Sequence, residues 1–223
     1  ATAFGELGQV QIIAGLGQGA VLFLIASGLT LVFGALRVIT FAHGSLYMLG
    51  AYITTTIAPS SMGIAWFWLI FLAAGVIIAA SSVVLEIGFF RPIYNRPLLT
   101  QLLVTFAFVL IITGIVREFW GPSSFTTSRP SQFDQSVGIL DGRIPVSNFA
   151  FMGAAIIAAV ALWAILYRTD LGRMIRAAVS DPVLLGMTGV YVKILFTGVF
   201  VLAAFFAGTA GGIITLQGSV GLD

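Results

Sequence analysis

The chain has 223 residues, of which 59% are hydrophobic and 8% charged, and its mean hydropathy is +1.11. A soluble domain of this length could not bury so much apolar surface, so the composition indicates a helical membrane protein in contact with lipid. The net charge of +2 does not suggest a nucleic-acid partner, and the lack of cysteine excludes disulfides and thiolate metal sites. With one histidine and no catalytic motif, we expect no metal, no cofactor and no enzyme activity.

Apolar segments of about 20 residues predict an all-α, polytopic transmembrane bundle that forms one domain over residues 1–223. The segments cover residues 12–36, 41–58, 64–90, 98–120, 149–167 and 194–216. At about 1.5 Å per residue, every segment except the second is long enough to cross a hydrocarbon core of ~30 Å. The second segment is short, and we expect His43-Gly44 to interrupt it.

The basic residues between these segments predict the orientation of the chain in the membrane. If every segment crosses, one side carries Arg37, Arg91, Arg96, Arg168, Arg173, Arg176 and Lys193, and the other carries Arg117, Arg129 and Arg143. Because cytoplasmic loops carry an excess of Lys and Arg, the first side is predicted to be cytoplasmic. The loop over residues 121–148 would then be extracytoplasmic.

That loop is rich in turn-forming residues, with Gly121-Pro122 and Asp141-Gly142 as the clearest signals. The stretches on either side of Asp141-Gly142, residues 137–140 and 143–146, are predicted to form a small hairpin. An outer aromatic belt is expected beside the loop, from Trp66, Trp68, Phe119 and Trp120.

Ionisable side chains are rare in the predicted spans and lie near the span ends. Glu86 precedes Arg91 by about one turn, so we expect the two to pair or to extend to the cytoplasmic interface. The sequence has no series of Asp, Glu or His within its spans such as a proton-driven pump requires. Energy for any transport is therefore expected to come from another protein.

The start of the second segment is the candidate for a solute path. Thr40 is a plausible helix cap. A helix that begins there directs the free backbone N–H groups of its first turn toward whatever lies in front of its N-terminus. Gly44 would let a neighbouring backbone approach. Two interpretations of His43 stay open: it is a packing residue hydrogen-bonded to an adjacent helix, or it borders a path together with Thr40, Phe41, Gly44 and Tyr47.

Small residues predict close helix contacts in two spans. Gly15 and Gly19 form a GxxxG pair, and Ala204, Gly208 and Gly212 recur every four residues. These residues fit either packing within one subunit or contact with a second subunit.

The polar segment over residues 168–193 lies between two apolar runs and has its own helix signals. Asp170 is predicted to cap a helix over residues 171–179, and Asp181 a second helix with Pro182 in its first turn and Gly189 at its end. Val183, Leu184 and Met187 would form an apolar face on the second helix. That face either docks on a partner protein or packs back on the spans, with the arginines as membrane anchors.

Four stretches together resemble the Liv-type permeases, the membrane subunits of branched-chain amino-acid ABC importers. They are residues 26–52 (with FAHG), 91–97 (RPIYNRP), 119–122 (FWGP) and 168–190 (LGR…RA…DP…G…G). The resemblance covers nearly the whole chain and implies a multi-pass protein of a bacterial or archaeal cytoplasmic membrane. Family members continue with further helices beyond the position of Asp223, so this chain would end inside the domain.

The resemblance also implies partners. These are a second permease, identical or different, two cytoplasmic ATP-binding subunits, and a periplasmic or lipid-anchored substrate-binding protein. The coupling segment that docks on the ATPases would comprise Arg173, Arg176, Asp181, Pro182, Leu184, Gly186 and Gly189. The substrates of such permeases are branched-chain amino acids, and in other members urea, amides or aromatic acids. The alternatives are an ion-coupled secondary transporter and, more remotely, an intramembrane enzyme.

Overall fold

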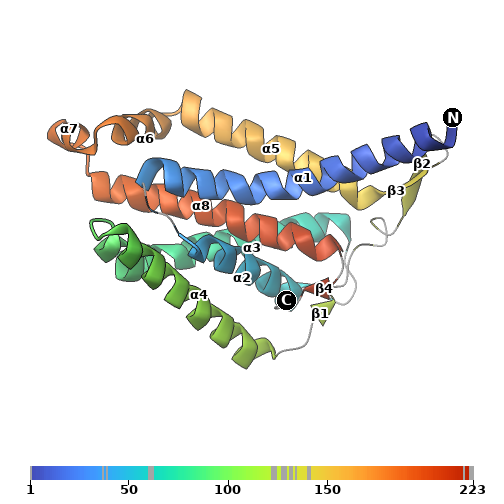
Figure 1. The fold of residues 1–223 in the computed structure, drawn as a ribbon, viewed down its shortest axis with the longest axis horizontal. Coiled ribbons are helices and arrows are strands. Elements are labelled where there is room, and N and C mark those ends of the chain that lie inside the picture. Colours follow the sequence, from blue (N-terminus) through green and yellow to red (C-terminus); the bar gives the residue numbers. More distant parts are fainter. Residues whose placement is uncertain are drawn as a thin grey trace.

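The structure is a computed structural model that describes residues 2–36, 38, 40–59, 63–121, 125–126, 130, 133, 135–139, 142–217 and 219–220. Long helices run side by side and alternate in direction along the described chain (Figure 1). They are α1 (Thr2–Leu36), α2 (Ala42–Ile57), α3 (Ile64–Leu85), α4 (Leu98–Trp120), α5 (Val146–Arg168) and α8 (Val192–Ile214). Their bounds match the six apolar segments within a few residues, except that α1 begins earlier. The all-α polytopic bundle is confirmed.

Five of these helices, in the part of the chain described, are long and apolar enough to cross a membrane. The exception is α2, whose 16 residues extend about 24 Å. The predicted interruption at His43-Gly44 is wrong, because both residues lie in the first turn of a continuous helix. Phe41, not the predicted Thr40, occupies the N-cap position of α2, although the Thr40 hydroxyl accepts a hydrogen bond from the Ala42 N–H at 3.1 Å.

The centre of the bundle is α8, which packs against α1, α2 and α3. Glycine makes this approach possible at several points: a Cβ at Gly50 would overlap the Gly208 backbone, and one at Gly211 would overlap the Tyr47 carbonyl oxygen. The close contacts predicted for the last span are thus formed within the chain. Gly15 and Gly19 differ, because a Cβ at either position would meet no described atom within 4 Å.

One end of the bundle carries short strands (Figure 1). β2 (Ser136–Ile139) and β3 (Gly142–Pro145) form the predicted hairpin, in which Val137 pairs with Ile144. β1 (Phe125–Thr126) pairs with β4 (Ser219–Val220). Asp141, in the expected turn, and Arg129 lie outside the described residues. Trp120 closes the same end, because its indole N–H donates to the Thr56 hydroxyl at 2.7 Å.

The opposite end carries α6 (Asp170–Ser180) and α7 (Pro182–Met187), and also the end of α3, where the π-helix η1 (Glu86–Phe90) and the 3-10 helix η2 (Arg91–Ile93) follow. A further 3-10 turn, η4 (Thr215–Gln217), ends α8.

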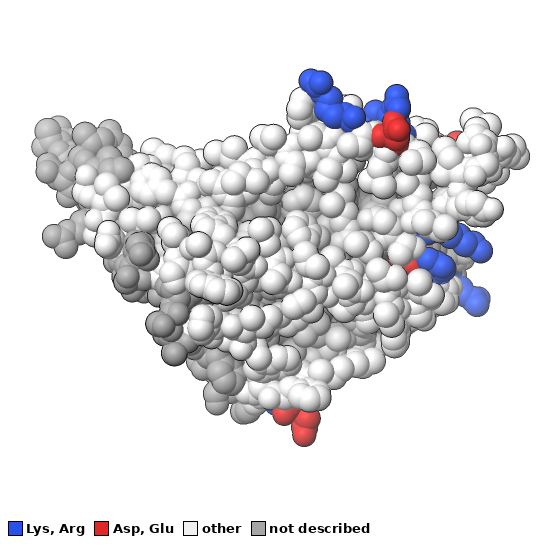
Figure 2. Space-filling model, turned by 180° about the vertical axis from the view of Figure 1, so that it is seen from behind, with Lys and Arg blue, Asp and Glu red and all other residues white. Residues whose placement is uncertain are grey.

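Most basic side chains of the described chain gather on the α6–α7 end (Figure 2). They are Arg91, Arg96, Arg168, Arg173, Arg176 and Lys193. Arg37 lies outside the described residues.

Candidate functional site

The polar segment begins with a sharp corner between α5 and α6. The predicted cap at Asp170 is wrong by one residue: the Thr169 hydroxyl accepts from the Gly172 N–H at 3.2 Å, so Thr169 is the N-cap. Asp170 instead occupies the first turn and pairs with Arg173. Gly172 is needed at the corner because a Cβ there would overlap the Ile165 carbonyl oxygen at the end of α5.

The two arginines predicted to share a face of α6 have different partners. Arg173 is exposed and pairs with Asp170. Arg176 turns back to α5, where its guanidinium donates to the Leu166 carbonyl and lies 5.0 Å from the centre of the Tyr167 ring. Arg176 therefore holds the corner together, whereas Arg173 is open to a partner.

The second short helix, α7, forms as predicted. The Asp181 carboxylate accepts from the N–H groups of Val183 and Leu184, both at 2.9 Å, and Pro182 occupies the first turn. Gly189 ends the segment with a φ of +88°, a value that glycine adopts without strain. The helix is therefore capped at both ends by its own residues.

An apolar face of α7 points away from the rest of the described chain. Val183 is 67% exposed, Leu184 60% and Met187 78%, and no residue of α7 is buried among the described atoms. These three residues form what we call the α7 face. The described part of the chain does not cover it, so packing back on the spans, one of the two expected arrangements, does not occur within this structure.

The candidate path residues separate into two groups. Thr40 and His43 are buried between α1, α2 and α8, whereas Phe41 and Gly44 are exposed and Tyr47 is half-buried. A Cβ at Gly44 would meet nothing within 4 Å, so the expected close approach there is absent from the described structure.

The buried His43 joins α2 to α1. Its Nε2 lies 3.1 Å from the carbonyl oxygen of Ile25, and its ring is so close to Gly28 that a Cβ there would overlap it. Among the described residues, the packing beside the ring leaves no space for a water molecule. These contacts support the interpretation of His43 as a packing residue.

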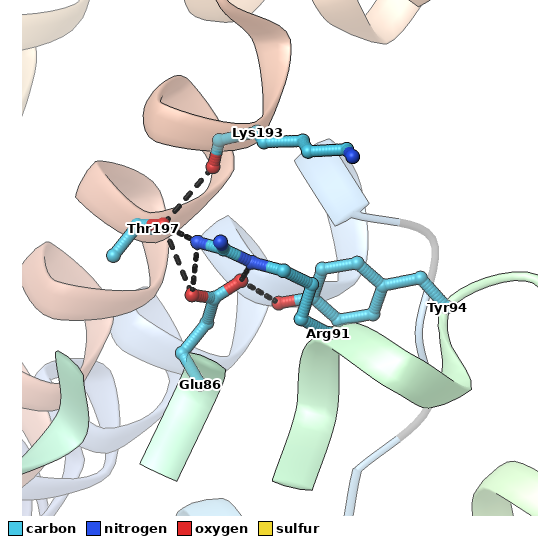
Figure 3. A network of polar contacts seen from close by, with 5 residues as sticks. All are labelled: Glu86, Arg91, Tyr94, Lys193 and Thr197. Atoms are coloured by element: carbon cyan, nitrogen blue, oxygen red, sulfur yellow. Dashed lines mark hydrogen bonds and ion pairs between the residues drawn. The ribbon is translucent and has the colours of Figure 1, made fainter. Parts of the chain in front are cut away.

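A polar cluster at the end of α3 links it to α8 (Figure 3). Arg91 pairs with Glu86 as expected, with Nη2 2.8 Å from Oε2 and Nε 3.2 Å from Oε1. Two further donors were not foreseen: the Tyr94 hydroxyl at 3.0 Å from Oε1 and the Thr197 hydroxyl of α8 at 2.9 Å from Oε2. Burial and the nearby Glu86 carboxylate raise the pKa of Tyr94 well above its usual value, so its hydroxyl remains a donor. The Glu86 side chain is fully buried.

The hollows of the bundle are lined mainly by apolar side chains, although Arg176 borders the one between α1, α5 and α6. One of about 230 Å³ lies between α1, α3, α5 and α8, beside residues such as Leu24, Phe71 and Phe205. No charged side chain lines it. Such a surface could accommodate an aliphatic side chain, but it offers no fixed charge for an amino or carboxylate group.

The fold and these sites define a multi-pass helical membrane protein with a folded polar segment at one end. The family model described as branched-chain amino acid transport system / permease component matches residues 11–222. The chain belongs to this family. It is therefore a permease subunit of an ABC importer, a transport protein of the cytoplasmic membrane that works with ATP-binding and substrate-binding partners.

Individual relatives agree with this assignment. The high-affinity branched-chain amino acid transport system permease protein LivH of Escherichia coli is 28% identical over 217 residues, which is 90% of this chain and 68% of the relative. The probable branched-chain amino acid transport permease protein LivH of Methanocaldococcus jannaschii is 27% identical over 94% of this chain and 67% of the relative. The permease protein BraD of Pseudomonas aeruginosa is 25% identical over 93% of this chain and 70% of the relative. No solved structure matches the chain.

Proposed function

We propose that this permease carries branched-chain amino acids and that α6 and α7 form the segment on which its ATP-binding partners dock. The names of the LivH and BraD relatives support the substrate class. One observation carries the docking assignment: a capped helix, too short to span a membrane, exposes the apolar side chains of Val183, Leu184 and Met187 together. An apolar groove on an ATP-binding subunit would cover this face.

The proposed orientation follows the basic residues. In it, α6 and α7 face the cytoplasm, and the β2–β3 hairpin faces a periplasmic or lipid-anchored binding protein. A second permease, identical or different, would complete the path. We propose that this path runs along the side of α2 that exposes Phe41 and Gly44 and partly exposes Tyr47, with Thr40 and His43 behind it as packing residues.

An apolar hollow in the bundle supports the proposal that the binding protein selects the solute and the permease provides the path. Because no charged side chain lines the hollow between α1, α3, α5 and α8, discrimination between solutes would depend mainly on the binding protein. An ion-coupled transporter, the rival function, would need a carboxylate inside the membrane that is free to bind the coupling ion. Glu86 does not meet this need, because Arg91, Tyr94 and Thr197 already satisfy both of its oxygens.

The test is transport by the complete importer in proteoliposomes. The full-length protein is purified with its natural partner subunits and reconstituted with ATP inside, and uptake of labelled leucine, isoleucine and valine is compared with that of urea. We expect ATP-dependent uptake of the three amino acids, with no uptake driven by a sodium or proton gradient alone. Gradient-driven uptake without ATP would contradict the proposal, and ATP-driven uptake of urea alone would correct the substrate.

A further inference from the structure

The Glu86 cluster lies where the coupling segment joins the bundle. α8 begins at Val192, directly after the α7 segment ends, and Thr197 is less than two turns into it. Through Thr197, α8 contacts the fully buried carboxylate of Glu86, which belongs to η1 at the end of α3. Figure 3 shows this contact close to the start of α8, so a movement of α7 that displaces the start of α8 would strain it.

The π-helix at the end of α3 makes the cluster possible. In an α-helix, residues five apart point about 140° away from each other around the axis. In η1 the Arg91 N–H donates to the Glu86 carbonyl, which is the five-residue spacing of a π-helix, and the two side chains therefore lie together. A π-turn is rare and often marks a functional position. Here it turns Arg91 onto Glu86, the only carboxylate in the described stretch from α3 to η2.

The Thr197 hydroxyl can exchange its partner. It has one proton and two acceptors within range, Glu86 Oε2 at 2.9 Å and the Lys193 carbonyl oxygen of its own helix at 3.0 Å. If α8 moves away from α3, the hydroxyl donates to Lys193 instead. Glu86 then keeps Arg91 and Tyr94, so neither side of the broken contact leaves a buried polar group without a partner.

Arg91 also tolerates this exchange. Its Nη2 lies 2.6 Å from the Thr197 hydroxyl oxygen, and its side chain is 31% exposed. Water at this rim can therefore replace the threonine when α8 moves. The contact stabilises the present arrangement, yet it can open at low cost.

We propose that Glu86, Arg91 and Thr197 form a latch between α3 and α8 that is closed in this conformation and opens when the ATP-binding partners move α7. These are positioning residues, which set the relative placement of two helices and do not contact the solute. The proposal rests on the docking function proposed for α7. It adds the element inside the membrane that responds to docking.

The test compares Thr197→Val, which keeps the shape of the side chain but removes the hydroxyl, with Thr197→Ser, which keeps the hydroxyl. Spin labels are placed on cysteines introduced at Asn95 and Ile194, both exposed, in the full-length assembled importer, after any other cysteine of the assembly has been replaced. Without nucleotide, we expect a single distance in the wild type and Thr197→Ser. Thr197→Val should show a second, longer distance, because the closed state loses a hydrogen bond to the Glu86 carboxylate, whereas the open state loses only the weaker one to the Lys193 carbonyl.

Coupling provides the second readout. Thr197→Val should raise ATP hydrolysis in the absence of solute and lower the solute carried per ATP, and Thr197→Ser should restore both. Identical distances in Thr197→Val and the wild type would overturn the latch, whatever the transport result. If the nucleotide-free distances behave as expected but ATP drives no uptake in the wild type, the contact is supported and the proposed importer function is the part that fails. If wild-type distances do not change with ATP during active uptake, opening of the latch is refuted and the importer stands.

Discussion

Replacing Leu184 with aspartate should disconnect ATP hydrolysis from transport. Burial of a whole leucine side chain contributes about 1.5–3 kcal/mol, and Leu184 is 60% exposed, so docking can gain roughly 1–2 kcal/mol from this residue. A neutral polar group left unpaired in the same apolar contact costs about 1–3 kcal/mol, and a carboxylate costs more because it is charged. The sum of at least ~2 kcal/mol corresponds to roughly 30-fold weaker docking.

The assay measures binding of the purified ATP-binding subunits to the full-length permease, together with uptake and ATP hydrolysis in proteoliposomes. Ser180→Asp is the matched control, because it adds the same charge at the exposed last residue of α6 but leaves the α7 face intact. Arg176→Glu should weaken docking less than Leu184→Asp, since Arg176 is engaged with Leu166 and Tyr167 on α5. Normal ATP-driven uptake by the Leu184→Asp protein would refute the docking assignment.

Three further predictions concern orientation and packing. A cysteine at Ser136 in β2 should react with a membrane-impermeant thiol reagent in intact cells, and one at Ser180 only after lysis; the reverse pattern would invert the proposed orientation. His43→Ala should lower the melting temperature and reduce uptake in proportion to the amount of folded protein, because the ring fills the contact between α1 and α2; lost uptake at normal stability would instead place His43 on the path. Gly211→Ala should destabilise the bundle by about 1–3 kcal/mol, because its Cβ would overlap the Tyr47 backbone, whereas Gly19→Ala should leave the melting temperature of the isolated permease unchanged; equal effects in thermal unfolding would argue against the packing described.

The parts of this structure that could be predicted from sequence depend on interactions between near neighbours. Long apolar runs located the spans, and Asp181 and Gly189 located α7, because a cap forms with backbone groups two or three residues away. Thr169 and Asp170 are both good cap residues, and composition could not choose between them. The choice depends on the corner with α5, where the Thr169 hydroxyl reaches the Gly172 N–H.

Other features depend on residues that are distant in the chain. Thr197 lies 111 positions from Glu86, so nothing local predicts that its hydroxyl meets the carboxylate. The π-turn that places Arg91 over Glu86 also has no simple sequence signal. Small-residue spacing likewise identifies helix faces that can approach closely but not the partner: a Cβ at Gly211 would overlap Tyr47, whereas one at Gly15 or Gly19 would meet no described atom within 4 Å.

The capping of α7 has a consequence for the rate and strength of assembly. Asp181 and Gly189 fix both ends of this helix with groups from the segment itself, so its shape does not depend on a partner. A segment that is ordered before contact loses little conformational entropy on binding, whereas one that folds on its partner must offset that loss. We therefore expect the permease and its ATP-binding subunits to associate as preformed bodies, in a single kinetic step without a slower folding phase.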